Sequence, residues 1–244
     1  MNNTKQINKI DYPIRINRYL ALHNYCSRRE ADGFITKGIV EINGKKARIG
    51  DKVYENDKVK VDLKVYRKVK EYVYLAYNKP KGELTNQDNQ TGKKIKDGGK
   101  FPEDIFPIGR LDKISHGLII LSNDGRITDK LLNPNRNHEK EYVIKVNKPI
   151  KNIFLKIMSV GVQLEDFKTK PCIINKKDDF TFNIILTEGK KHQIRRMCDN
   201  LGWGITDLRR IRIMNIKLGN LGLGHYRKIQ GKELEEFLKK LEIK

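Results

Sequence analysis

The 244-residue chain has few cysteines, few prolines and no long apolar run, and these shortages exclude several classes of protein. Cys26, Cys172 and Cys198 are far apart and form no CxxC pair, so neither a disulfide framework nor a metal site is predicted. No stretch approaches the ~20 apolar residues of a membrane span, and the N-terminus lacks the apolar core of a signal peptide. We therefore expect a cytoplasmic protein with reduced thiols and no membrane partner.

Acidic residues are also scarce relative to basic ones. The chain has 30 Asp and Glu against 51 Lys and Arg, which gives a formal net charge of +21. Such an excess repels itself unless an anionic partner is nearby, and nucleic acid and acidic membrane surfaces are the common partners. Because 38% of the residues are hydrophobic and only 7 are proline, the charge is expected on a folded scaffold.

The N-terminal part of the chain predicts a small module of two helices and a few strands. Apolar residues between 14 and 22 recur at helical spacing, and Ser27–Glu30 has the form of a capping box, which starts a helix that should end at Gly38. Asn43-Gly44 predicts a tight hairpin turn between two short strands. Residues 1–70 carry 17 Lys and Arg against 8 Asp and Glu, about twice the net positive charge per residue of the remainder. The module is therefore the better candidate for a dedicated anion-binding domain.

From Tyr72 onward the pattern changes to strands, with few strand–helix–strand repeats. Strands are predicted at 72–77, 117–122, 140–146, 180–187 and 211–216, and helices at 126–132, 150–160, 192–201 and 232–244. This order favours an α+β fold with a mostly antiparallel sheet over a doubly wound fold. The expected parts of the chain are a flexible N-terminus (1–13), the small module (14–63), a charged linker (64–71) and a larger domain (72–244). The polar stretch at 86–100 predicts a mobile loop near a functional site.

Three segments carry residues that could do chemistry. Asp112 follows Arg110 in a turn, where it is either a reactive acid or a turn residue that bonds its own backbone. Residues 188–197 place four basic side chains and His192 at a helix start, an arrangement that can bind phosphates. The simpler interpretation is a solvated basic face. No nucleophile motif accompanies His192, so an RNA-contacting or structural histidine is preferred to a general base. Tyr142 is either an ordinary strand residue or a platform on which a base stacks.

Several motifs, in this order, resemble a known family. The N-terminal segments IRINRYLA, CSRREAD and KGIVEINGKKA resemble an S4 RNA-binding domain. The segments NKPKG, FPIGRLDKISHGLIILSNDG, HEKEYVIKV and EGKKHQIRRM resemble the RsuA-type family of RNA pseudouridine synthases, and the likeness covers about residues 14–230. The resemblance implies the pseudouridine synthase fold and an isomerase, an intramolecular transferase, that converts a uridine of ribosomal RNA to pseudouridine without a cofactor or metal. Within the family, the similarity is greatest to members that act on 23S rRNA.

The resemblance also implies roles for individual residues. Asp112 would be the catalytic aspartate, Tyr142 would stack on the target uracil, and Arg195 would form an ion pair with Asp112. Ile194 would supply an apolar wall, and Arg110 would hold the RNA backbone or the flipped nucleotide. Basic residues of both domains would bind RNA: Arg15, Arg18, Arg28, Arg29, Lys45 and Lys46 in the S4 domain, and Lys190, Lys191, His192 and Arg196 in the catalytic domain.

Some alternatives stay open at this point. Asp112 could attack as a nucleophile or remove the C2′ proton of the sugar, and the sequence favours neither. The second function considered is a non-catalytic RNA-binding or ribosome-assembly factor with the same fold. A 16S rRNA target and a tRNA loop as a further substrate also stay open, and a monomer is expected. Ile114 and His116 stand where the resemblance predicts acidic or small polar residues.

Overall fold

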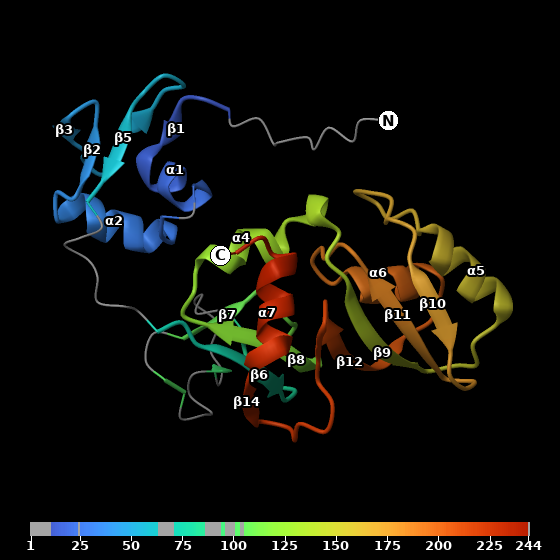
Figure 1. Ribbon diagram of the computed structural model, residues 1–244. Helices are drawn as coiled ribbons and strands as arrows, with labels where there is room; N and C mark the ends of the chain where they lie inside the picture. The colour runs from blue at the N-terminus through green and yellow to red at the C-terminus, as the bar shows by residue number, and fades with distance from the viewer. Residues whose placement is uncertain are drawn as a thin grey trace, which may run out of the picture. The chain divides into compact units, whose positions relative to one another are not determined.

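A computed structural model of the chain describes residues 11–23, 25–62, 71–85, 94–95, 101–102 and 105–243. The chain divides into two compact units, residues 1–71 and residues 72–244 (Figure 1). Residues 1–10 of the expected N-terminal tail, residues 64–70 of the expected linker and most of the polar stretch at 86–100 lie outside the described residues.

In the first unit, two short helices share a core with short strands. The elements are β1 (Ile14–Arg15), α1 (Ile16–Leu22), α2 (Arg28–Thr36), β2 (Val40–Ile42), β3 (Lys45–Lys46), β4 (Lys52–Val53) and β5 (Val59–Val61). β2 pairs antiparallel with β3 and β5, and β1 pairs antiparallel with β4. The predicted capping box starts α2: the N–H of Glu30 donates to Ser27 Oγ at 3.3 Å, and the N–H of Ser27 donates to Glu30 Oε2 at 2.9 Å.

Most strands of the second unit form one mixed sheet in the order β10-β11-β9-β12-β8-β6-β14. The pairs are antiparallel except for β12 and β8, which run parallel, and β7 and β13 add to β8 and β12. The strands are β6 (Tyr74–Lys79), β7 (Phe106–Ile108), β8 (His116–Ser122), β9 (Lys140–Val146), β10 (Ile173–Lys176), β11 (Thr181–Leu186), β12 (Ile205–Ile213), β13 (Ile216–Lys217) and β14 (Tyr226–Lys228). The α+β class with a mostly antiparallel sheet is confirmed. β12 begins six residues before the predicted strand, and the sequence pattern does not reveal β7, β10 or β14.

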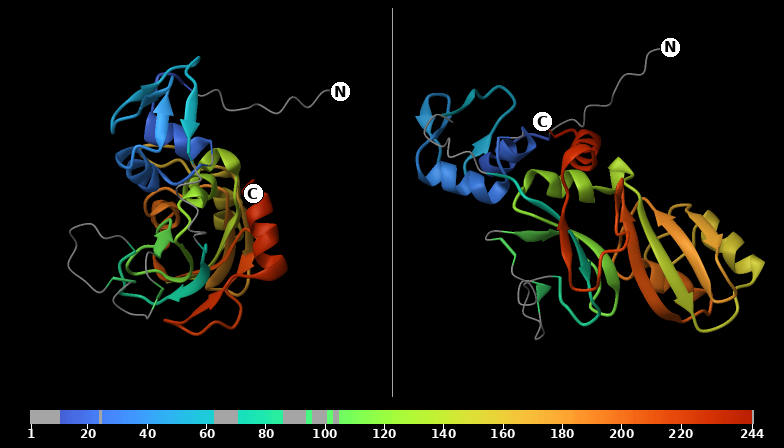
Figure 2. Two further views of the ribbon diagram at one scale, coloured as in Figure 1. Left: turned by 60° about the vertical axis from the view of Figure 1, so that its left-hand side comes forward. Right: turned by 60° about the horizontal axis from the view of Figure 1, so that its bottom comes forward.

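Helices cover different parts of this sheet. α5 (Asn152–Val160) and α6 (Gln193–Asn200) bury Phe154 and Met197 against one face of β9 and β11. α4 (Arg126–Leu132) and α7 (Gly231–Lys240) share a second core with β6 and β8, and α7 lies along that face of the sheet (Figure 1; Figure 2). All six residues of β6 are buried, because Tyr74 and Ala76 face this second core while Leu75 and Tyr77 face a further cluster on the other side.

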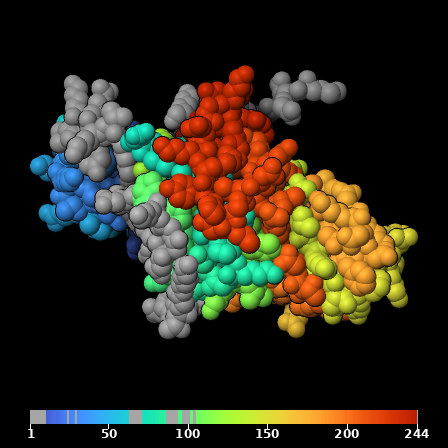
Figure 3. All heavy atoms as spheres, turned by 90° about the horizontal axis from the view of Figure 1, so that it is seen from below, coloured from blue at the N-terminus to red at the C-terminus, as the bar shows by residue number. Residues whose placement is uncertain are grey.

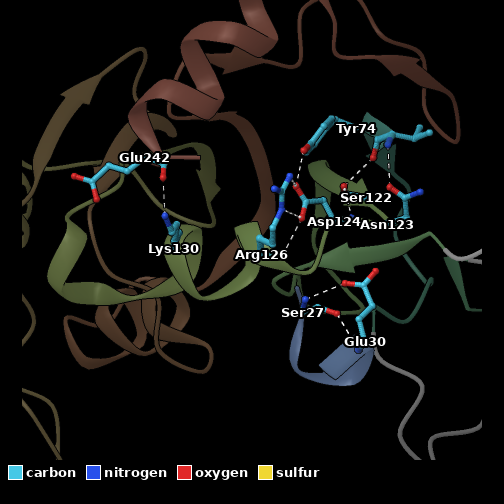
Figure 4. A network of polar contacts seen from close by, with 10 residues as sticks. Ser27, Glu30, Tyr74, Ser122, Asn123, Asp124, Arg126, Lys130 and Glu242 are labelled. Atoms are coloured by element: carbon cyan, nitrogen blue, oxygen red, sulfur yellow. Dashed lines mark hydrogen bonds and ion pairs between the residues drawn. The ribbon is translucent and has the colours of Figure 1, made fainter. Parts of the chain in front are cut away.

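A buried polar network fixes the start of α4 (Figure 4). Asp124 is fully buried, and it accepts hydrogen bonds from Tyr74 Oη at 2.6 Å and from Arg126 Nε at 2.8 Å. Burial and the neighbouring carboxylate raise the pKa of Tyr74 far above its ordinary value, so the phenol stays a hydrogen-bond donor. Because the buried carboxylate has both a cation and a hydroxyl donor, the network secures the strand–helix connection that follows β8.

The C-terminal segment supplies an edge strand of the sheet. β14 pairs with β6, and the carbonyl oxygen of His225 accepts the N–H of Asn78 at 3.0 Å. In Figure 3 this segment, in red, lies against the teal segment that contains β6. Lys130 Nζ on α4 donates to the carbonyl oxygen of Glu242 at 2.7 Å (Figure 4). Within the described residues, none of the helices has the length and apolarity needed to cross a bilayer.

Candidate active site

Residues 109–115, called the Asp112 turn below, join β7 to β8. The N–H of Ser115 donates to the carbonyl oxygen of Asp112 at 3.0 Å and closes the turn. Thr85 secures the other side, because its Oγ1 donates to the carbonyl oxygen of Leu111 at 2.6 Å and accepts the N–H of Leu111 at 3.2 Å. Leu111 is buried, whereas the side chain of Asp112 is 32% exposed. The turn therefore presents one carboxylate to solvent from a backbone that is tied on both sides.

A buried lysine lies behind the turn. Lys79, the last residue of β6, is fully buried, and its Nζ donates to the carbonyl oxygens of Pro80 and Ser115, both at 2.9 Å. Burial lowers the pKa of Lys79 to about 8, although the negative charges of Glu83 and Asp112 favour the protonated form. The lysine thus links the end of β6 to the Asp112 turn through two buried backbone acceptors.

A buried arginine on β12 supports the other end of the same turn. Arg210 is 4% exposed; its Nε donates to the carbonyl oxygen of Leu118 at 2.6 Å and its Nη1 to that of Arg110 at 3.3 Å. Its Nη2 is buried and has no hydrogen-bond partner among the described residues. β12 comes close to β8 at Gly117, where φ is +106° and a Cβ atom would lie 2.3 Å from the carbonyl oxygen of Arg210. Glycine is therefore required where the turn enters β8.

Residues 190–196, called the basic helix start below, lie at the beginning of α6. His192 precedes the first helical residue in the left-handed region, with φ +53°, and its Nε2 lies 3.6 Å from Asp112 Oδ1. Lys190 Nζ lies 3.7 Å from the centre of the Phe167 ring. Arg196 forms an ion pair with Asp166. Lys190, Lys191 and His192 are exposed, so the basic helix start brings positive charge and a histidine to the side of the carboxylate.

The expected ion pair between Arg195 and Asp112 is absent from the described residues. Arg195 Nη2 instead donates to Ser115 Oγ at 3.0 Å, three residues further along the Asp112 turn. Among the described residues, the one positive partner within ion-pair distance of Asp112 is His192, when that histidine is protonated. Ser115 is fully buried, and its hydroxyl is the acceptor that Arg195 uses in place of the carboxylate. Arg195 Nε is buried without a partner among the described residues, so the guanidinium keeps an unused donor.

Tyr142 and Ile194 both belong largely to the core beside the site. Tyr142, on β9, is 8% exposed and lies opposite Arg210 in the strand register. The guanidinium of Arg210 lies 6.0 Å from the centre of the Tyr142 ring. Ile194 is 6% exposed and shares a hydrophobic cluster with Tyr142 and Leu111. The structure therefore brings the predicted aromatic and apolar residues next to the Asp112 turn, with little of either side chain open to solvent.

His116, which departs from the expected motif, has a partner at the end of the turn. Its Nε2 lies 3.0 Å from Asp207 Oδ2 on β12, and Lys81 also forms an ion pair with Asp207. Burial raises the pKa of Asp207, but the hydrogen bonds from Lys81 and His116 outweigh it, so the net pKa is below the ordinary value. This cluster ties the NKPKG segment to the strand beside the Asp112 turn.

The predicted RNA-binding residues of the first unit are exposed, as a binding role requires. Arg15 ends β1, Arg18 lies on α1 and Arg28 begins α2, while Lys45 and Lys46 form β3. The side chain of Arg29 lies outside the described residues. In the second unit, Arg110 is exposed beside Asp112.

Lys79, Ser115 and Arg210 are the supporting residues that sequence reasoning missed. One signal was available, because Lys79 ends a strand segment, YLAYNK, that contains no other charged residue, and a buried charged side chain is unusual. Nothing in the local pattern distinguishes Arg210 from the neighbouring Arg209. Lys79 contacts Ser115, which lies 36 positions away in the sequence, and Arg210 contacts Arg110, which lies 100 positions away. A local sequence pattern carries no information on contacts over such separations.

Together, the two units define a class of protein that acts on RNA. A basic helix–strand unit accompanies an α+β unit in which one partly exposed carboxylate lies beside the exposed basic helix start. Residues 73–200 match the RNA pseudouridylate synthase family, and residues 14–68 match the S4 domain. The chain therefore belongs to the RNA pseudouridine synthase family, and it is an isomerase that acts on RNA.

Individual relatives agree with this assignment. The dual-specificity RNA pseudouridine synthase RluF of Salmonella typhi is 42% identical over 234 residues, which cover 95% of this chain and 81% of that protein, and the Escherichia coli K12 protein of the same name is 41% identical over the same shares. The ribosomal large subunit pseudouridine synthase B of Bacillus subtilis is 32% identical, over 91% of this chain and 94% of that protein. A crystal structure of a pseudouridylate synthase superposes with a TM-score of 0.68 at 26% identity, over 93% of this chain and 99% of that one. The predicted family resemblance is confirmed, and proteins named synthase F are among the relatives that the chain matches over most of its length.

Proposed function

We propose that this enzyme isomerises a specific uridine of 23S rRNA and that Asp112 is its catalytic residue. The observation that carries the assignment is the Asp112 turn: one partly exposed carboxylate on a backbone fixed by buried partners, facing the exposed basic helix start. Support for a large-subunit target comes from the motif similarity and from the name of the Bacillus subtilis relative. A tRNA loop is proposed as a further substrate, in keeping with the dual-specificity name of the Salmonella typhi relative.

The chemistry sets clear demands on this site. The N1–C1′ bond of the nucleotide breaks, the uracil turns, and C5 bonds to C1′ while C5 loses a proton and N1 gains one, so no net oxidation occurs. Whether Asp112 attacks as a nucleophile or removes the C2′ proton, it must be ionised. The neighbouring cations attract the phosphates of RNA.

The target base must leave its stack before it can turn, at a cost of a few kcal/mol. In our proposal Tyr142 supplies an aromatic surface for the uracil, Ile194 an apolar wall, and Arg110 a contact with the RNA backbone or the flipped nucleotide. Arg195 acts through Ser115 and through its unused Nε donor rather than through an ion pair with Asp112. These contacts offset part of the cost of extrusion.

The two units are proposed to divide the work. Residues 72–244 form the catalytic domain, and residues 14–63 dock on RNA through the exposed side chains of Arg15, Arg18, Arg28, Lys45 and Lys46, with Arg29 assigned from the sequence alone. Lys190, Lys191, His192 and Arg196 guide the RNA backbone at the catalytic domain. A ribosomal RNA substrate implies that the enzyme works in the cytoplasm, and we propose that it acts as a monomer.

Chemical mapping of pseudouridine tests this proposal. The 23S rRNA, 16S rRNA and tRNA of cells that lack the gene are compared with those of cells complemented by the wild type or by Asp112→Asn. One or a few 23S sites should disappear and return only with the wild type. A site that returns in 16S rRNA instead would correct the target, and unchanged pseudouridine in all three RNAs would favour a non-catalytic RNA-binding or ribosome-assembly factor.

A further inference from the structure

Ile114 is an exposed apolar side chain two residues after the proposed catalytic carboxylate. It is 59% exposed, whereas Leu111 in the same turn is 7% exposed. A single exposed isoleucine is common on protein surfaces and by itself needs no explanation. The backbone around Ile114 and the charges that flank it make this position different.

The backbone on both sides of Ile114 is fixed by other segments. The carbonyl oxygen of Lys113 accepts the N–H of Gly82 at 2.7 Å, and the carbonyl oxygen of Ser115 accepts Lys79 Nζ at 2.9 Å. Ser115 also donates its N–H to Asp112 and accepts Arg195 through its hydroxyl. Because both flanking peptides are hydrogen-bonded to other segments, the turn holds the exposed apolar side chain in a preorganised position.

The surroundings of this side chain are cationic. Arg110 and Lys113, on the same turn, are exposed, and Lys81 is exposed next to the glycine that bonds the turn. Such groups attract the phosphates of RNA and bring its backbone against the turn. An apolar side chain makes no favourable interaction with phosphates, but it can take the place of a base within a stack.

We propose that Ile114 is an apolar wedge that enters the RNA stack beside the target and occupies the space left by the extruded uridine. The inference rests on the proposed function, because it assumes that the target uridine is flipped toward Asp112. Extruding a stacked base leaves a gap that costs a few kcal/mol, and an inserted isoleucine offsets part of that cost by covering the exposed faces of the neighbouring bases. The wedge makes and breaks no covalent bond.

The test compares one uridine in two settings. Single-turnover rates are measured on a hairpin that contains the mapped target and on a short unstructured RNA with the same uridine and flanking bases. Ile114→Ala should slow the hairpin reaction by about tenfold, which corresponds to ~1.4 kcal/mol, and leave the unstructured RNA within a factor of about two. Ile114→Leu, which retains an apolar side chain of similar size, should keep the hairpin rate close to that of the wild type. Ile153→Ala on α5 removes an isoleucine of similar exposure, 56%, and should change neither rate.

A second readout follows extrusion without chemistry. In the Asp112→Asn background, the fluorescence of a 2-aminopurine placed next to the target should increase when protein that retains Ile114 binds the hairpin. The further substitution Ile114→Leu should give a similar increase, because an apolar side chain of similar size can still enter the stack. Ile114→Ala should give a smaller increase at saturating protein, and an equal increase with this variant would contradict the wedge.

The outcomes separate the wedge from the proposed function. Equal slowing on both RNAs would contradict the wedge, because Ile114 would then affect the chemical step or the fold, and unchanged rates on both RNAs would contradict it as well. If the wild type forms no pseudouridine on either RNA, the proposed target and the wedge at that target are both contradicted.

Discussion

The Asp112 turn and the basic helix start meet at one site, but they are built in different ways. The turn is fixed by buried groups: Lys79 is fully buried, Arg210 is 4% exposed, and both donate to carbonyl oxygens of the turn. At the helix start, Lys190 and Lys191 are exposed, and Lys190 contacts the ring of Phe167. One segment is therefore rigid before RNA arrives, and the other presents charge to the solvent.

The difference indicates how binding and chemistry are divided. Reacting groups must be placed within a fraction of an ångström, which needs a backbone that does not move. Phosphate binding tolerates motion, because its strength depends on the number of charges neutralised rather than on one geometry. We therefore expect substitutions in the turn to change the rate and substitutions at the helix start to change affinity.

The largest effect is expected at Asp112. Asp112→Asn keeps a side chain of the same shape in the turn but removes the charge, so the single-turnover rate should fall by at least ~100-fold. Release of tritium from RNA labelled at C5 of uridine measures the rate, because C5 loses its hydrogen in the reaction. RNA affinity should stay within about tenfold, or ~1.4 kcal/mol. An equal loss of affinity and rate would indicate a structural aspartate.

A double substitution at the helix start should have the opposite effect. Lys190→Gln with Lys191→Gln removes two exposed cations, so the dependence of log affinity on log salt should become shallower by about two, with the rate at saturating protein kept. The matched control is Lys151→Gln with Lys156→Gln, which removes two exposed cations next to and on α5. A reduced rate at saturation, with an unchanged salt slope, would show that the helix start contributes to the chemical step rather than to RNA affinity.

Tyr142 should show a smaller effect. Tyr142→Phe retains the ring beside Arg210 and removes only the hydroxyl, so stacking is kept and the single-turnover rate should fall by less than about tenfold. The same tritium assay measures it. Complete inactivity would show that the hydroxyl takes part in the reaction, and the turn would then share its chemical role with β9.

Lys79 should appear in the pH dependence of stability. Its pKa is about 8 in the folded protein and 10.5 ordinarily, so between these pH values the unfolded chain binds the proton more tightly. The unfolding free energy should therefore rise with pH through this window, by at most ~3 kcal/mol from this group. Urea titrations of the wild type and of Lys79→Met, compared at each pH, isolate the contribution. A difference that stays constant from pH 7 to 10.5 would contradict the buried, charged lysine.

Local sequence patterns predicted the elements whose signals lie close together. The capping box at Ser27 started α2, and the apolar spacing within 126–132 gave α4 with the bounds that the structure has. β12 begins at Ile205, six residues before the predicted start at residue 211. The prediction missed its first half because Thr206, Asp207 and Arg209 make that half polar. That half is only partly buried, so the apolar alternation that marks a strand is missing there.

Local patterns also predicted only those parts of the candidate site that lie within one continuous segment. Asp112 and the cations at 190–196 lie in two continuous segments, and the sequence singles out both. Lys79 and Arg210 act on the turn from distant strands, so their contribution becomes visible only in the folded chain. The resemblance placed Arg195 against Asp112, but the structure places it against Ser115, three residues along the same turn, a difference that motif order cannot resolve.

The most direct test of the division between turn and helix start is one experiment on one RNA. The dissociation constant and the single-turnover rate at saturating protein are measured side by side for the wild type, Asp112→Asn and the Lys190→Gln, Lys191→Gln double variant. Asp112→Asn should lose rate and keep affinity, and the double variant should lose affinity and keep rate. If both quantities fall together in both variants, the turn and the helix start act as one unit, and binding and chemistry are not divided between them.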